Sequence, residues 1–127
     1  MATRLYLSND TSARAAGAGA LAEAWCDRPD VQLIRTSSRG AFYLEPMVER
    51  DSPQGRIAWF NVSPQDLPSI LAGTRATPVE TIPFLAHQTR CTFANFGETE
   101  PLALDEYQAR GGLSGLEAAF RLTPDAI

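Results

Sequence analysis

Hydrophobic and polar positions at the start of the chain predict a strand, a helix and a second strand. Residues 3–8 (TRLYLS) alternate with the period of a half-buried strand. Residues 9–12 (NDTS) have side chains that favour a helix N-terminus, and an alanine-rich run continues from them to Trp25. Pro29 ends this helix, and residues 31–36 (VQLIRT) predict the next strand.

The next stretch predicts a hairpin and a covering helix. Residues 46–49 and 56–62 have strand patterns on either side of the turn sequence DSPQG. Residues 63–66 (SPQD) then place a serine at the cap, a proline at the first helical position and an acid in the first turn of a helix. The apolar stripe of this helix consists of Leu67, Ile70 and Leu71. The order β-α-β-β-β-α predicts an α/β domain over residues 1–75.

We expect residues 76–127 to form a short, mostly helical extension. Residues 74–82 have the composition of a linker, and the alternation in residues 90–96 predicts a strand. Helical spacing predicts one helix at residues 104–110 and another whose apolar face consists of Leu113, Leu116 and Phe120.

Residues 123–125 (TPD) have the pattern of a third helix start, and the sequence ends within four residues of Thr123. Because so short a helix is unstable in water by itself, we expect the sequence to be part of a longer chain. A frayed natural terminus is the alternative.

Composition and charge exclude several classes of protein. The chain is 44% hydrophobic and 20% charged, as in ordinary globular domains. The net charge of −4 argues against nucleic-acid binding as the main function, and no apolar stretch is long enough for membrane insertion. The first residues (MATRLYLSND) lack the apolar core of a secretory signal, so we expect a cytoplasmic protein in which Cys26 and Cys91 are reduced.

Few side chains suggest chemistry. His87 is the single histidine, so neither a metal site nor a catalytic triad is indicated, and Cys91 has no evident base. The acids, Glu45 and Glu49 among them, are expected on solvated faces. Arg39 lies beside Gly40, where a guanidinium and backbone N–H groups can hold an anion or a carboxylate of a partner; an ordinary salt bridge is the alternative.

Residues 82–127 carry a series of motifs in a fixed order. These are QTR after an apolar start, a hydrophobic stretch ending in FG, an acid–proline pair, DEYQARGG, an aliphatic helix and TPDAI. In this order they resemble the lead-in of the flavoprotein subunit shared by NADH:quinone oxidoreductases, NAD-reducing hydrogenases and NAD-dependent molybdenum formate dehydrogenases. The resemblance implies that a glycine-rich loop for flavin mononucleotide (FMN) follows in the family, beyond the last residue printed.

The earlier residues, 3–73, resemble the thioredoxin-like [2Fe-2S] domain that accompanies that flavoprotein. The family's cluster loop resembles C-x-x-x-C followed four residues later by proline, with a glycine between the cysteines. Gly40 and Pro46 keep their places in this loop. The four positions that the family's cysteine ligands would occupy are Ser8, Ala13, Ser38 and Phe42.

The resemblance thus implies a thioredoxin-like domain that has lost its cluster, since four thiolates are needed to hold one. We expect Phe42 to be buried in the space of the former cluster. No catalytic, cofactor-binding or metal-binding residue is expected in residues 1–127, whereas FMN, NAD and iron–sulfur clusters are expected in the parent complex.

Together, the two resemblances imply that the chain is a structural or docking part of an NAD(H)-linked flavoprotein subunit. The parent reaction that we expect first is formate oxidation. A hydrogenase diaphorase subunit or an NADH:quinone oxidoreductase is the near alternative. The expected partners are the rest of the flavoprotein chain and neighbouring iron–sulfur subunits, or a second copy. Arg39, Tyr43 and Trp59 are the residues expected to contact a partner.

Two rivals belong to other classes. A redox-active thioredoxin-like enzyme requires a cysteine at the first helix N-terminus, and residues 9–12 contain none. A free-standing interaction module requires residues 74–127 to fold back on the first domain.

Overall fold

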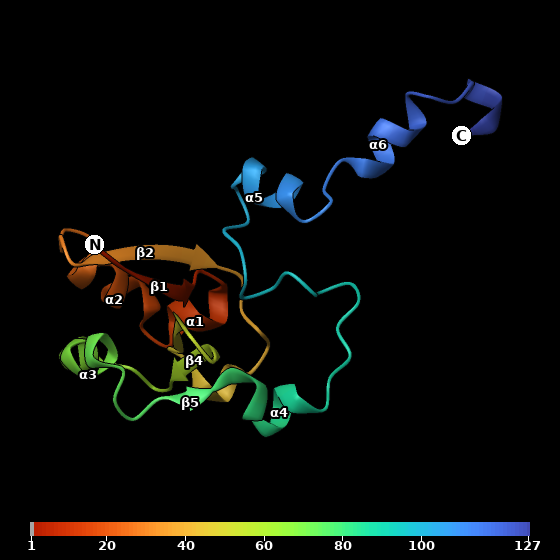
Figure 1. Cartoon of the computed structure of the whole chain (residues 1–127). Coiled ribbons are helices and arrows are strands. Elements are labelled where there is room, and N and C mark those ends of the chain that lie inside the picture. Colours follow the sequence, from red (N-terminus) through yellow and green to blue (C-terminus); the bar gives the residue numbers. More distant parts are fainter. Residues whose placement is uncertain (1) are drawn as a thin grey trace.

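Five strands form one mixed sheet in the computed structural model, which describes residues 2–127. Their order is β2-β1-β3-β4-β5; β1 and β2 are parallel, and the other neighbours are antiparallel (Figure 1). The bounds are β1 Thr3–Ser8, β2 Val31–Thr36, β3 Val48–Ser52, β4 Gly55–Trp59 and β5 Thr77–Pro78. The predicted α/β fold is confirmed, and the first two strands have their predicted bounds.

The helices are short. The α-helices are α1 Thr11–Ala15, α2 Ala18–Trp25, α3 Leu67–Ala72, α4 Pro83–Ala86, α5 Leu104–Ala109 and α6 Ser114–Ala119. Single 3-10 turns lie at Phe42–Leu44, Pro64–Asp66, Val79–Thr81 and Pro124–Ala126. The start of the predicted helix at residue 63 is confirmed, because the backbone N–H and the hydroxyl of Ser63 both donate to Oδ2 of Asp66, at 2.9 and 2.8 Å.

Two predicted elements have different bounds in the structure. The single helix expected up to Trp25 is divided into α1 and α2 at Gly17, whose φ of 109° lies in the left-handed region that glycine adopts readily. The hairpin of β3 and β4 is confirmed, but its strands occupy residues 48–52 and 55–59. Pairing of Ser52 with Gly55 closes the turn more tightly than the sequence predicts.

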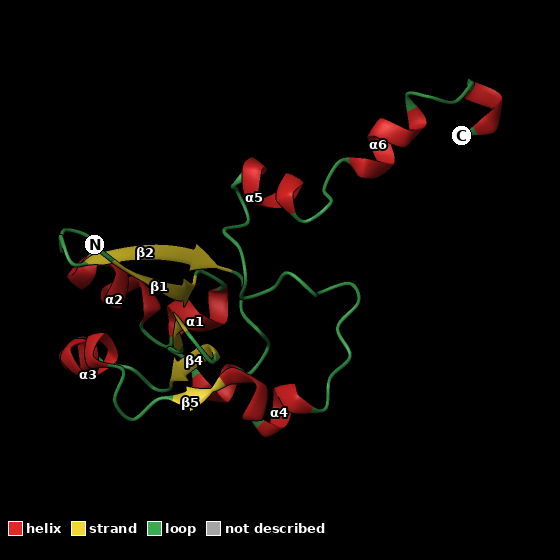
Figure 2. Ribbon diagram, viewed as in Figure 1, coloured by secondary structure: helices red, strands yellow, loops and turns green. Residues whose placement is uncertain are grey.

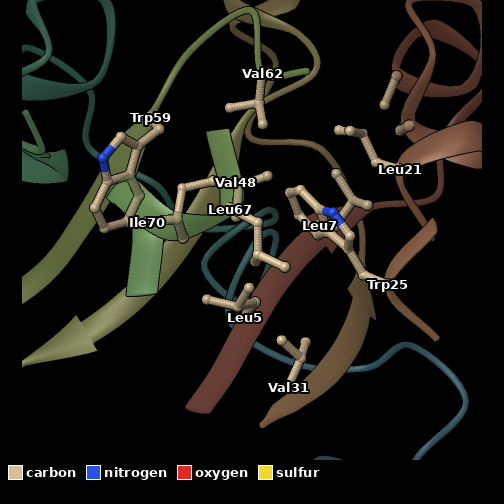
Figure 3. Close-up of a cluster of buried hydrophobic side chains, with 12 residues drawn as sticks. Leu5, Leu7, Leu21, Trp25, Val31, Val48, Trp59, Val62, Leu67 and Ile70 are labelled. Atoms are coloured by element: carbon tan, nitrogen blue, oxygen red, sulfur yellow. The ribbon is translucent and has the colours of Figure 1, made fainter. Parts of the chain in front are cut away.

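One face of the sheet carries the main hydrophobic core, whose buried side chains are drawn in Figure 3. Residues of α1, α2 and α3 contribute to this core from the helices. The register decides this face, because Leu7 of β1 pairs with Val48 of β3, and Val48 pairs with Trp59 of β4. The buried members are Leu5, Leu7, Ala13, Ala18, Leu21, Trp25, Val31, Val48, Trp59, Val62, Leu67 and Ile70.

The opposite face is partly apolar and partly charged. Met47, Ala58, Val79 and Ile82 form a smaller apolar cluster at the β5 end. Toward β1, the pleat places Tyr6 beside its register partner Glu49. This second face is covered by the chain that follows β5.

Residues 74–98 differ from the prediction. The segment expected to be a linker contains β5, which pairs with β4 beyond the boundary predicted after residue 75. The strand predicted at residues 90–96 is wrong, since these residues form turns (Figure 2). This segment is not held by the backbone hydrogen bonds of a strand pair. Side-chain hydrogen bonds to the loop after β2 hold it instead.

The last part of the chain extends away from the sheet. The two predicted helices are confirmed as α5 and α6, and in Figure 1 α6 and the C-terminus lie far from the strands. Large apolar side chains remain exposed here, with Phe120 at 80%. They are Leu102, Leu104, Tyr107, Leu116, Phe120, Leu122 and Ile127. The extension therefore has no hydrophobic core of its own.

Candidate functional site

The candidate site lies where the parallel strands β1 and β2 end, the usual position of ligand sites in α/β sheets. Residues 37–46, here called the β2–β3 loop, form one wall of an open cavity of about 560 Å³. Residues 88–98, here called the strap, form the other wall. Asp10 lines the cavity from the end of β1, and its Oδ2 accepts a hydrogen bond from the Ser38 backbone N–H at 2.7 Å.

Three of the four positions assigned to lost cluster ligands are buried near this end of the sheet. Ser8, Ala13 and Ser38 are each 5% exposed or less. Phe42 is 60% exposed, so the prediction that its ring fills the core is wrong. The 3-10 turn at Phe42–Leu44 buries Ala41 and turns the Phe42 side chain outward, where it lines the cavity.

One carboxyl group of the β2–β3 loop, that of Glu45, is buried. Its Oε1 accepts from the Ser38 hydroxyl at 3.1 Å, and its Oε2 accepts from the Met47 backbone N–H at 2.8 Å. Burial raises the pKa of Glu45 above its usual value, and these two hydrogen bonds oppose that shift only in part. The expectation that Glu45 lies on a solvated face is wrong.

Arg39 forms a buried ion pair and is not free to bind an anion. Its Nε and Nη2 donate to Oε1 and Oε2 of Glu49 at 2.7 and 2.8 Å, and Nη2 also reaches Glu98 Oε1 at 2.6 Å. The Arg39 and Glu49 side chains are only 8% and 5% exposed. Burial alone lowers the pKa of Arg39, but the bonds to Glu49 and then Glu98 outweigh it and raise the pKa. The salt-bridge alternative therefore describes Arg39.

Arg56 completes this network, and we call Arg39, Glu49, Arg56 and Glu98 the charge cluster. Arg56 reaches Oε2 of Glu49 at 3.3 Å and Oε2 of Glu98 at 3.5 Å. Its guanidinium also lies 3.6 Å from the centre of the Tyr6 ring. The cluster thus joins the loop, the sheet and the strap.

The strap approaches the cluster closely because residue 97 is glycine. Gly97 has φ of 78°, and a Cβ there would lie 2.6 Å from Cγ of Arg39. Its carbonyl accepts from Arg56 Nη1 at 3.3 Å. At the other end of the strap, Arg90 Nη2 donates to the Arg39 carbonyl at 2.5 Å. Both ends of the strap are therefore fastened around Arg39.

Sequence reasoning missed the charge cluster. Side chains alternate between the two faces of a strand, and this alternation places Glu49 of β3 and Arg56 of β4 on the same face of the sheet. The sequence therefore contained a signal for this ion pair. The participation of Glu98 has no local signal, because it lies 49 positions beyond Glu49 and joins only when the strap folds back.

Of the three residues expected to contact a partner, Tyr43 is the accessible one. It is 63% exposed and packs edge-on against the Phe84 ring, with centroids 6.3 Å apart. Trp59 is 7% exposed, and its indole N–H donates to the Thr74 carbonyl at 2.7 Å. The side chains of Trp59 and Arg39 have partners within the domain.

Metal-binding and nucleophilic side chains are not gathered at this site. His87, Cys26 and Cys91 are all exposed, and of these three only Cys91 lines the cavity. Within residues 2–127, His, Cys, Asp and Glu do not come together in any group of three or more that could hold a metal ion. In the same residues, none of the helices has the length and apolarity needed to cross a bilayer.

Comparison with known proteins returns no match: neither a protein-family model nor a curated protein matches this chain.

Proposed function

We propose that this chain is a docking domain of an NAD(H)-linked flavoprotein subunit in a cytoplasmic enzyme, with formate oxidation as the parent reaction. In this role the domain carries no cofactor. It receives the flavoprotein domain, and neighbouring iron–sulfur subunits, on its apolar extension.

The observation that carries the proposal is the exposed apolar surface of residues 99–127. Seven large hydrophobic side chains of this segment are exposed to solvent, and extensive exposed apolar surface is typical of interaction sites. They belong to residues 82–127, whose motifs resemble the flavoprotein lead-in. A folded flavoprotein domain would cover them and remove their exposure.

Two further features support a thioredoxin-like origin. The parallel pair β1–β2 with antiparallel β3 and β4 beside it follows the order expected of such a domain. The positions of the family's cluster ligands hold Ser8, Ala13, Ser38 and Phe42, of which none supplies a thiolate.

The test is isolation of the tagged full chain from its own cells, followed by assays for FMN fluorescence and NADH-dependent ferricyanide reduction. Both are expected to accompany the tag, and formate-dependent NAD reduction selects formate over hydrogen or quinone. The double variant Leu116→Glu/Phe120→Glu is expected to lose this association, whereas Glu117→Gln on the same helix keeps it. Isolation of the chain without flavin or NADH oxidation contradicts the proposal.

The absence of a cluster is tested separately, by anaerobic reconstitution of the full chain with iron and sulfide. No charge-transfer absorption is expected. Stoichiometric iron and sulfide with such bands would show that the chain supplies ligands and would overturn the lost-cluster reading.

A free-standing interaction module is the second candidate function. Residues 77–98 favour it, because they fold back onto the sheet through β5 and the strap, whereas α6 and the C-terminus extend away from the sheet (Figure 1). In that case the full chain is monodisperse and binds no flavoprotein, an outcome that the same isolation experiment detects.

A further inference from the structure

The cavity between the β2–β3 loop and the strap has the size of a small-molecule site. Its volume of about 560 Å³ falls within the range of about 300–1,000 Å³ that ligand pockets occupy. It lies at the carboxyl ends of the parallel strands, where backbone and side chains of several segments converge. This position is separate from the apolar extension that carries the proposed docking function.

Aromatic rings form much of the cavity wall. Phe42 comes from the loop, and Phe93 and Phe96 come from the strap, with the latter two rings packed at a centroid distance of 4.8 Å. All three side chains are exposed to solvent although they lie within one concave surface. Flat apolar walls of this kind favour a ligand with an aromatic or other planar apolar body.

One cation lines the same cavity without a carboxylate partner. Arg90 donates through Nη2 to the Arg39 carbonyl and through Nε to Gln88 Oε1, at 2.5 and 3.1 Å. Among the ion pairs formed by residues 2–127, none includes Arg90. Burial and then the nearby charge of Arg39 lower the pKa of Arg90, while Glu49 and Glu98 oppose this shift. An anion at this point would offset the repulsion from Arg39.

Arg39 also lines the cavity, but it is held by Glu49 and Glu98. The third charged group of the cavity, Asp10, is engaged as well. Its Oδ2 accepts from the Ser38 backbone N–H, which offsets part of its negative charge. Ser38 Oγ, which donates to Glu45 and accepts from the Gly40 N–H, is likewise occupied within the protein. Arg90 is therefore the side chain that can add a new charge-assisted bond.

We propose that this cavity binds a small aromatic or planar apolar anion, with Arg90 contacting its acidic group and the Phe42, Phe93 and Phe96 rings contacting its body. Binding requires neither a partner subunit nor FMN, so its test is independent of the proposed docking function.

The test uses two matched probes, 2-naphthoate and the neutral 2-naphthylmethanol, titrated into the ¹⁵N-labelled full chain. Amide shifts are expected in the loop and the strap. Because charge-assisted hydrogen bonds are about twice as strong as neutral ones, naphthoate is expected to bind about fivefold more tightly than the alcohol. Equal affinities, no saturable binding, or shifts confined to α5 and α6 would overturn the proposal.

Variants assign the preference to named side chains. Arg90→Gln is expected to reduce naphthoate affinity to that of the alcohol, and Arg90→Lys to restore part of the preference. Asp10→Asn keeps an oxygen that accepts from Ser38 but removes a repulsive charge, so naphthoate should bind more tightly. The control Arg121→Gln removes an exposed charge outside the cavity and should change neither affinity. An undiminished naphthoate preference in Arg90→Gln, or weaker naphthoate binding in Asp10→Asn, would overturn the role of Arg90.

Discussion

The charge cluster makes a quantitative prediction about stability through its central pair, Arg39 and Glu49. The two hydrogen bonds of this pair measure 2.7 and 2.8 Å, and the side chains are 8% and 5% exposed. Removing one partner of a buried pair leaves an uncompensated charge and costs about 3–5 kcal/mol. Each remaining group keeps one further partner, Glu98 for Arg39 and Arg56 for Glu49. We therefore expect Arg39→Met and Glu49→Leu each to lose about 3 kcal/mol, the lower end of that range.

The double variant should lose less than the sum of the single variants. Removing Arg39 and Glu49 together leaves Arg56 and Glu98, which are 3.5 Å apart and carry opposite charges. The remaining charge cluster is therefore neutral. The coupling energy is then expected to reach about 2 kcal/mol or more. Salt should change it little, because buried pairs are screened less than exposed ones.

The assay is urea unfolding of the full chain, monitored by tryptophan fluorescence and circular dichroism. Trp25 and Trp59 are both buried in the main core, so their emission reports its loss. The matched control is the exposed pair Arg28–Asp30, which has similar bidentate geometry at 2.9 and 2.8 Å but side chains 49% and 44% exposed. Arg28→Gln and Asp30→Asn should show negligible coupling. Additive losses for Arg39→Met and Glu49→Leu, equal to the control, would refute the reasoning.

Three further predictions concern the strap and the buried carboxyl group. Gly97→Ala should lower the free energy of unfolding in urea by about 1–2 kcal/mol, because residue 97 has a left-handed backbone conformation. A further cost arises because the new Cβ would lie 2.6 Å from Cγ of Arg39, whose side chain must move. Gly19→Ala, in open space within α2, should instead be neutral or stabilising; equal effects would contradict this argument. Glu98→Gln should weaken the fastening of the strap and speed trypsin cleavage within residues 88–98 several-fold, and unchanged cleavage would show that Glu98 does not hold it. Burial raises the pKa of Glu45, so the folded state holds the Glu45 proton to a higher pH than the unfolded state does. The free energy of unfolding therefore decreases as pH rises from the unfolded pKa of about 4.3 through the folded pKa. Glu45→Gln should therefore gain unfolding free energy relative to the wild type between pH 4 and 7, and a constant difference would contradict the shift.

The local pattern of the chain determined much of the fold. Alternation located β1 and β2, and the SPQD cap located the start of the helix that includes α3, because these signals depend on neighbouring residues. The same local logic failed at residues 90–96. Their alternation suits a strand, but a strand also requires an edge with which to pair, and these residues instead bond to the β2–β3 loop through Arg90.

Only the tertiary structure decided the character of the candidate site. The residue types of Glu45, Glu49 and Glu98 predict solvated acids, because burying a charge is costly without a partner. Glu49 and Glu98 find their partners, Arg39 and Arg56, on other segments, whereas Glu45 is held within its own loop by Ser38. Phe42 shows the reverse case, since its apolar ring predicts burial while the turn that carries it directs it into the open cavity. The sequence determined which local elements form, whereas the meeting of distant segments decided which charges are buried and which rings remain exposed.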